Sequence, residues 1–257
     1  MSPEQAARSA GPSSICCPQP ANRSARWLAT PPRRPTAAPP GVEVVVGDLS
    51  RPETISSALR GVTSLFVHPR AVGQAAPRLL GLAAQHGVSN VAVLAAFNVD
   101  DDPSMQPSRL NGDRNKEVEG AVTSSGLRWV SVRPGSFAAS TLTMFAAQAR
   151  HGDVIRGPCA GFADAPIHEI DIAAVLAAAL LDDTLAGQKI SITGPLSLTH
   201  DQMVTTIGEV IGRPLSSVRR AASRQRLRPS IWRAAPQPAC TNVFNRRRRG
   251  PPRSGRK

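Results

Sequence analysis

The sequence contains no tyrosine, and only 4% of its 257 residues are aromatic. Proton transfer from a tyrosine phenol is therefore excluded. The four cysteines, at positions 16, 17, 159 and 240, show neither metal-ligand spacing nor a disulfide framework, so we predict no metal site. The longest apolar run, 172–181, is too short to cross a bilayer, and no apolar segment typical of a secretory signal is present. These absences favour a cytoplasmic protein that does not bind membranes.

Acidic residues are missing from the last part of the chain, although the net charge is +13. Residues 215–257 hold 13 basic residues and no acidic one, and residues 1–40 hold five arginines against one glutamate. Residues 41–214 hold 13 basic and 17 acidic residues, so the basic charge belongs to the two ends. The four adjacent arginines at 246–249 offer charge without base readout, so we expect nucleic acid to bind only non-specifically through this tail, if at all.

Glycine is scarce and proline abundant near the start. Residues 1–40 contain one glycine, Gly11, and nine of the 24 prolines. Neither this segment nor the arginine-rich end has a sustained apolar period, so neither can offset its ordering entropy by burial. We predict a disordered or aberrant segment over 1–40, one domain over 41–215, and a basic disordered tail over 216–257. Ordered but irregular ends are the alternative.

Between these ends, apolar strands alternate with amphipathic helices. Short apolar runs predict buried strands at 42–46, 64–67, 91–96 and 129–132, and a later strand from 188. Helical periodicity predicts helices over 73–87, 113–126, 140–152 and 168–183. Ser50 with Glu53, and Thr199 with Gln202, have the spacing of capping boxes that open two further helices. The alternation predicts an α/β fold with a parallel sheet.

Several segments together resemble a known family: "VEVVVGDLS", "GVSNVAVLAAFNVDDD", "GLRWVSVRPGSFAASTL" and "PIHEIDIAAVLAAALL". In this order they are similar to the NmrA-like branch of the atypical short-chain dehydrogenases, over about residues 41–215. The resemblance implies a Rossmann-like doubly wound parallel sheet that binds NADP or NAD. It also implies a hydride transfer to an unidentified small molecule, since the family includes quinone and azo reductases.

The resemblance also implies which residues contact the cofactor. Asp48 and Leu49 match the pair beside the adenine, although Asp48 could instead cap the following turn. His68 and Pro69 match the strand end near the nicotinamide ribose, where a histidine could instead be structural. The remaining matches lie at two further strand ends: Ala95, Ala96, Pro134, Gly135, Ser136 and Phe137.

Two departures from the family pattern limit the activity. In classical relatives a tyrosine and a lysine four residues later relay a proton, but Asn111 and Asn115 stand in those places. Lys116 is one residue out of register, which on a helix is a rotation of about 100°. Asn115 is the candidate catalytic residue that remains, and the classical proton relay is excluded.

The second departure is the missing glycine-rich turn. A dinucleotide site needs such a turn after the first strand, so that backbone N–H groups can approach the pyrophosphate. Residues 1–40 have the length for a strand, turn, helix and second strand, but no such glycine motif. We therefore expect the first strand to be missing, which a shifted reading frame would explain, and cofactor binding to be weak. A non-enzymatic dinucleotide-sensing regulator and a degenerate copy with impaired binding are the alternatives.

Overall fold

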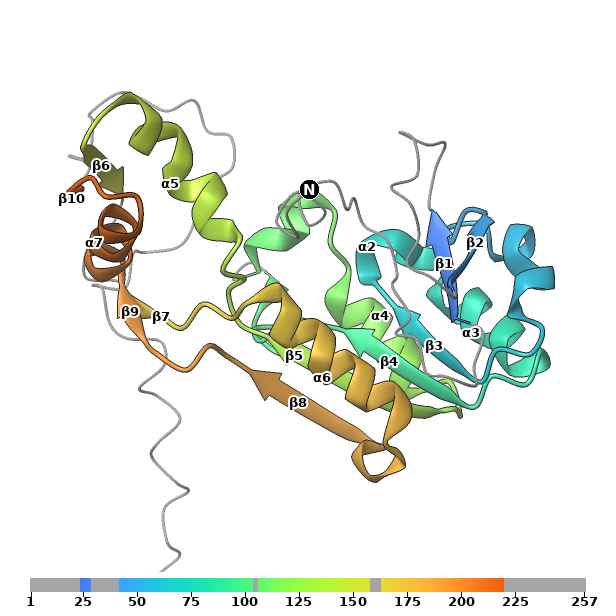
Figure 1. The fold of residues 1–257 in the computed structure, drawn as a ribbon. Helices are drawn as coiled ribbons and strands as arrows, with labels where there is room; N and C mark the ends of the chain where they lie inside the picture. Colours follow the sequence, from blue (N-terminus) through green and yellow to red (C-terminus); the bar gives the residue numbers. More distant parts are fainter. Residues whose placement is uncertain (1–23, 29–41, 104–105, 158–162, 220–257) are drawn as a thin grey trace, which may run out of the picture. The chain divides into compact units, whose positions relative to one another are not determined.

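The computed structural model describes residues 24–28, 42–103, 106–157 and 163–219 (Figure 1). Its internal contacts divide the chain into two compact units. The first unit comprises Met1–Gly135 and Ile167–Thr193, and the second comprises Ser136–Pro166 and Gly194–Lys257. All four cysteines lie outside the described residues.

The first unit is built on a four-stranded parallel sheet. Its strand order is β3 (Ser64–Val67), β4 (Asn90–Leu94), β5 (Arg128–Pro134) and β8 (Gln188–Ile192). The parallel α/β sheet predicted from the sequence is therefore confirmed. The strands differ from prediction at their ends: β4 starts one residue earlier and stops at Leu94, whereas β5 runs on to Pro134.

Helices cover both faces of this sheet (Figure 1). Buried residues of α3 (Ala76–Gln85) and α4 (Asn115–Thr123) pack against one face, with Leu79, Leu80 and Val118 in the same core cluster as Val91 and Val93. Helix α6 (Glu169–Leu181) contacts β3, β4 and β5. Short helical turns complete the unit: η1 (Pro52–Leu59), α2 (Pro69–Val72), η2 (Gly73–Ala75), η4 (Pro107–Asn111) and η5 (Asp183–Leu185).

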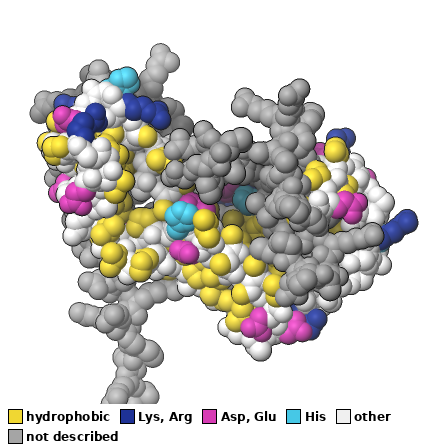
Figure 2. Space-filling model, viewed as in Figure 1, with side chains coloured by type: hydrophobic (Ala, Val, Ile, Leu, Met, Phe, Trp, Pro, Cys, Tyr) yellow, Lys and Arg dark blue, Asp and Glu magenta, His cyan; other side chains and the backbone are white. Residues whose placement is uncertain are grey.

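Helix α6 is apolar on most of its surface. Ile172, Leu176 and Leu180 are buried against the sheet, but Ile170 is 70% exposed at the opposite side. Figure 2 shows apolar side chains lying along the outer surface of this helix. Among the described residues, no helix is long and apolar enough to cross a membrane.

A separate two-stranded parallel sheet pairs β1 (Ser24–Leu28) with β2 (Val42–Val46). The expectation that residues 1–40 lack regular structure is wrong for β1, and the rest of that segment lies outside the described residues. Strand β2 was also expected to share a sheet with the other strands, but no described strand links it to β3.

The strand orders explain this separation. In the doubly wound order 3-2-1-4-5-6, the first strand lies between the second and the fourth. The sheets β2–β1 and β3–β4–β5–β8 correspond to the two sides of that position if β1 is the family's second strand. The described residues thus contain one strand that the sequence did not predict, β1. None of the described residues occupies the place of the family's first strand.

Strand β2 is less buried than its sequence predicts. Val45 packs against the core, but Val44 is 37% exposed and Val46 is 78% exposed. A continuous apolar run is typical of a strand covered on both faces. No residue of β2 is fully buried, so the prediction of a buried strand at 42–46 is wrong.

The second unit is smaller. Helix α5 (Ser140–His151) is followed by β6 (Val154–Gly157), which pairs in parallel with β10 (Ser216–Arg219). Strand β7 (Ala163–Asp164) pairs antiparallel with β9 (Leu198–Thr199), which leads into α7 (His200–Val210). Thr199 and Gln202 form the predicted capping box at the start of α7. Residues 220–257 of the predicted tail lie outside the described residues.

Candidate functional site

Three adjacent parallel strands bring predicted site residues to one edge of the sheet. His68 follows β3, Ala95 follows β4, and Pro134 ends β5. Backbone hydrogen bonds hold two of these ends together: the Ala95 N–H donates to the Val132 carbonyl at 2.7 Å, and the Phe97 N–H donates to the Pro134 carbonyl at 2.9 Å. Ligands of open parallel sheets bind at this carboxyl edge.

His68 caps the short helix that follows β3. Its Nδ1 accepts a hydrogen bond from the Arg70 N–H at 3.2 Å and caps the short helix α2, which begins at the buried Pro69. Burial and the positive charge of Arg70 lower the pKa of His68, while Asp113 acts in the opposite direction. Because Nδ1 is an acceptor, the neutral ring carries its proton on Nε2 and can donate from there.

Asp48 caps the turn that follows β2. Its carboxylate accepts hydrogen bonds from the Ser50 N–H at 2.9 Å and the Ser50 hydroxyl at 2.6 Å, and these bonds lower the pKa of Asp48. Arg51 adds an ion pair at 3.2 Å. The predicted capping box of Ser50 with Glu53 is wrong, because Arg51 occupies the N-cap of η1 and makes no side-chain cap. The turn-capping alternative for Asp48 agrees with this geometry, and its contact with adenine stays a prediction.

The other predicted residues differ in exposure. Leu49 packs in the hydrophobic core at 4% exposure, so only its backbone faces the turn. Ala95 is buried, whereas Ala96 and Gly135 are half-buried. Gly135 donates its N–H to the Ile192 carbonyl at 2.9 Å, which ties the end of β5 to β8. Ser136 and Phe137 begin the second unit.

The positions of the classical proton relay lie at and before the start of α4. Asn115 is the first residue of this helix and is half-buried, while Asn111 ends η4 and is exposed. Lys116 is exposed. The role of Asn115 stays a prediction, and neither asparagine is a residue type that relays a proton as a tyrosine–lysine pair does.

Sequence reasoning missed a buried ionic cluster at the same edge. Arg133 on β5 is 7% exposed and binds Glu119 of α4 through two hydrogen bonds of 2.8 and 2.7 Å. Its guanidinium also contacts Asp100, in the loop after β4, at 2.7 Å. Ser131, fully buried, donates its hydroxyl to Glu119. The signal in the sequence was the alternation of Ser131 and Arg133 with valines in an otherwise apolar strand.

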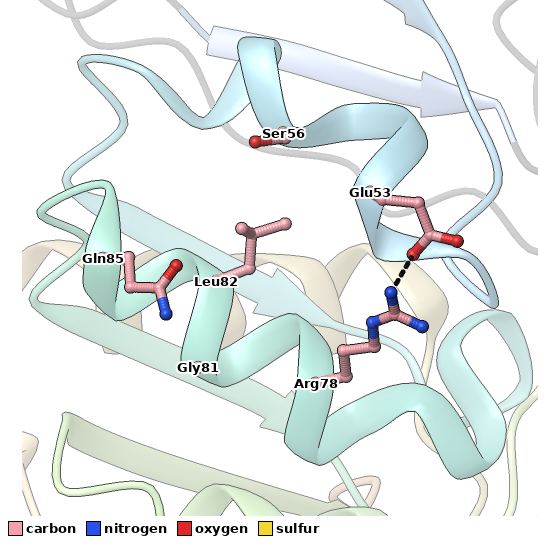
Figure 3. A pocket seen from close by; sticks show the side chains of 6 residues that line it. All are labelled: Glu53, Ser56, Arg78, Gly81, Leu82 and Gln85. Carbon is pink, nitrogen blue, oxygen red and sulfur yellow. Dashed lines mark ion pairs between the residues drawn. The ribbon is translucent and has the colours of Figure 1, made fainter.

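A cavity of about 280 Å³ lies elsewhere in the first unit, between η1 and α3. Figure 3 shows the ion pair of Glu53 with Arg78, at 3.3 Å, on its wall beside Leu82. None of the predicted cofactor contacts lines this cavity. We therefore place the candidate site at the strand ends and not here. Among the described residues, no cluster of histidine, cysteine and acidic side chains could hold a metal ion.

A parallel sheet with helices on both faces, and candidate residues at its carboxyl edge, are typical of nucleotide-binding proteins of the Rossmann type. The model of an NAD(P)H-binding family matches residues 25–183, which is more than half of the chain. The chain belongs to this NAD(P)H-binding family. The match starts within β1 and ends within η5, so it includes the carboxyl ends of β2, β3, β4 and β5.

Two reductases are similar in sequence. One is a (4-alkanoyl-5-oxo-2,5-dihydrofuran-3-yl)methyl phosphate reductase of Streptomyces griseus, 33% identical over 74% of this chain and 66% of the relative. The other is an NAD(P)H azoreductase of Xenophilus azovorans, 30% identical over 69% of this chain and 62% of the relative. The chain thus spans slightly less than two thirds of the length of each of these relatives.

Solved structures show the same fold. An NADPH-dependent quinone oxidoreductase of Escherichia coli, in complex with NADPH, has a TM-score of 0.60 at 22% identity and covers 70% of this chain and 63% of its own. A triphenylmethane reductase of a Citrobacter species, complexed with NADP(H), has a TM-score of 0.60 at 15% identity over 70% of this chain and 64% of its own. These likenesses establish a Rossmann-like NAD(P)-binding fold.

Proposed function

We propose that this chain is a reductase of the NmrA-like branch that transfers a hydride from NADPH or NADH to a small organic acceptor in the cytoplasm. The observation that carries the proposal is the convergence of His68, Ala95 and Pro134 at adjacent strand ends. Membership of the NAD(P)H-binding family and similarity to two reductases support it.

The nicotinamide half of the cofactor fits this edge. Ala95, Ala96 and Gly135 have small or no side chains, so a flat ring can approach their backbone closely. When bound, the nicotinamide supplies the hydride. The chain's own contribution is to position the ring and to exclude water from it.

The phosphate half fits less well. The pyrophosphate carries two charges that a complete site meets with backbone N–H groups at a helix N-terminus. Among the described residues, no glycine-rich turn follows a strand of the β1–β2 sheet or precedes β3. We therefore expect affinity at least about 100-fold weaker than that of a relative with this turn, or roughly 2.7 kcal/mol.

The proton that accompanies the hydride has few sources in this chain. His68, with its Nε2–H, and the Asn115 amide are the candidate donors from β3 and α4. Neither matches a tyrosine activated by a lysine. Acceptors that take their proton from water would suit such a site. Azo and quinone compounds, named for the similar proteins, are the first to test.

A regulator that binds the dinucleotide without reducing a substrate is the second candidate. The observation that favours it is the pair Asn111 and Asn115 at the relay positions, in a chain without tyrosine. Both the reductase and the regulator bind the dinucleotide, but only the reductase turns it over. Oxidation of bound NADPH by an added quinone therefore distinguishes the two functions.

Calorimetric titration of the purified chain with NADPH and NADH tests the proposal, followed by NADPH oxidation in the presence of quinone and azo acceptors. Binding with turnover supports the reductase, and binding without turnover for any acceptor supports the regulator. No binding of either nucleotide at millimolar concentration would reject both and leave a degenerate copy.

A further inference from the structure

Arg133 joins three segments of the first unit at the carboxyl edge of the sheet. It lies one residue before Pro134, at the end of β5, and its guanidinium contacts Glu119 of α4 and Asp100 of the loop after β4. The planar guanidinium of Arg133 thus donates hydrogen bonds to two carboxylates that lie in different directions.

The two carboxylates differ in their access to water. The Glu119 side chain is 6% exposed and accepts from Arg133 through both oxygens, at 2.8 and 2.7 Å. The Asp100 side chain is 59% exposed, although it too contacts the guanidinium twice, at 2.7 and 3.3 Å. Breaking the Glu119 contacts leaves a charge buried, whereas the Asp100 contacts can exchange with water.

The exposed ion pair of Arg133 with Asp100 holds the loop that follows β4, residues 95–100. This loop starts at Ala95 and is bonded to β5 by the Ala95 and Phe97 N–H groups. At its far end, Val99 is fully buried, and its carbonyl accepts from the Gln106 side chain at 3.2 Å. Asp100 follows Val99 directly, and its exposed carboxylate accepts hydrogen bonds from the guanidinium of Arg133.

We propose that Arg133 is a positioning residue that sets residues 95–100 against the end of β5, with Asp100 as the arm that can open. This inference rests on the proposed function, because residues 95 and 96 and Pro134 are the backbone expected to contact the nicotinamide. The inner arm, Glu119, keeps Arg133 in place whether Asp100 is bound or released. Opening of the outer arm frees the loop without unfolding the sheet.

The substitution Asp100→Asn tests the proposal in the full chain, with Asp101→Asn as the matched control. Both remove one negative charge from neighbouring positions of one loop, but only Asp100 contacts Arg133. For Asp100→Asn we expect amide hydrogen exchange over residues 95–100 to rise about 10-fold and NADPH affinity to fall about 5-fold, while the urea midpoint stays unchanged. Asp100→Glu, which restores a carboxylate, should recover most of both effects.

Hydrogen exchange does not require the cofactor, so it separates this inference from the proposed function. Failure of the unaltered chain to bind NADPH rejects the function, while exchange still decides whether Asp100 restrains the loop. Unchanged exchange over residues 95–100 overturns the positioning role. So does increased exchange throughout the unit with a lower urea midpoint, which indicates a general loss of stability. Faster local exchange with unchanged NADPH affinity in a chain that binds it also overturns the role.

Discussion

Substitution Glu119→Gln should strongly destabilise the first unit. It keeps an oxygen for the Ser131 hydroxyl but turns a carboxylate into an amide beside the guanidinium of Arg133, which is 7% exposed. Removing one partner of a buried ion pair typically costs 3–5 kcal/mol, and Asp100 still compensates part of the charge here. We therefore expect the free energy of unfolding to fall by about 3 kcal/mol.

Urea denaturation followed by circular dichroism measures this loss, and a double-mutant cycle with Arg133→Met assigns it. With the guanidinium gone, Glu119→Gln should cost much less, because no buried charge is left unpaired. Glu117→Gln on the same helix is the control, since its pair with Arg109 lies at the surface, and it should change the midpoint little. A loss below about 1 kcal/mol for Glu119→Gln, or additive losses in the cycle, would refute the reasoning.

Three further predictions concern glycines and a histidine. Gly47→Ala should lower the free energy of unfolding by about 1–3 kcal/mol, because its new methyl group meets Ile55, and the added substitution Ile55→Leu should relieve part of the loss in a urea titration. Gly194→Ala should cost more in the same assay, because the methyl group meets the backbone carbonyl of Pro166, which cannot rotate away. His68 has a lowered pKa in the folded chain, so unfolding free energy should fall as the pH drops below its unfolded value of about 6.5. His68→Gln should flatten this decline in urea titrations between pH 7.5 and 5.5, and an unchanged slope would show that burial of His68 does not matter.

The sheet was predictable because two of its strands, β3 and β4, are nearly continuous apolar runs bounded by polar turns. Ser64–Val67 was predicted with its observed ends, and 91–96 deviated by one or two residues. Such runs reflect burial on both faces, which is a local property of the sequence. The strand Ser24–Leu28 could not be predicted in this way, because serine and arginine interrupt its apolar residues. Its pairing with β2 is a contact between distant parts of the sequence, which no local pattern gives.

The candidate site was predictable in position but not in its contacts. Strand ends identify His68, Ala95 and Pro134, since parallel strands finish at one edge. The ion pair between Arg133 and Asp100 joins residues 33 positions apart, and no local pattern gives that distance. For Asp48 the local pattern is clear but ambiguous, because a turn cap and a ligand contact both require an aspartate at this place.

The exposed valines of β2 have a consequence for the expression and purification of the protein. Val46 and Val44 are exposed to water on a strand that pairs, within the described part of the chain, with β1 alone. Surfaces of this kind recruit other copies during expression, and their mutual attraction weakens on cooling. Growth at low temperature and purification at low concentration should therefore raise the soluble yield. Replacing Val46 with lysine should raise the soluble yield at any temperature, without altering the ends of β3, β4 and β5.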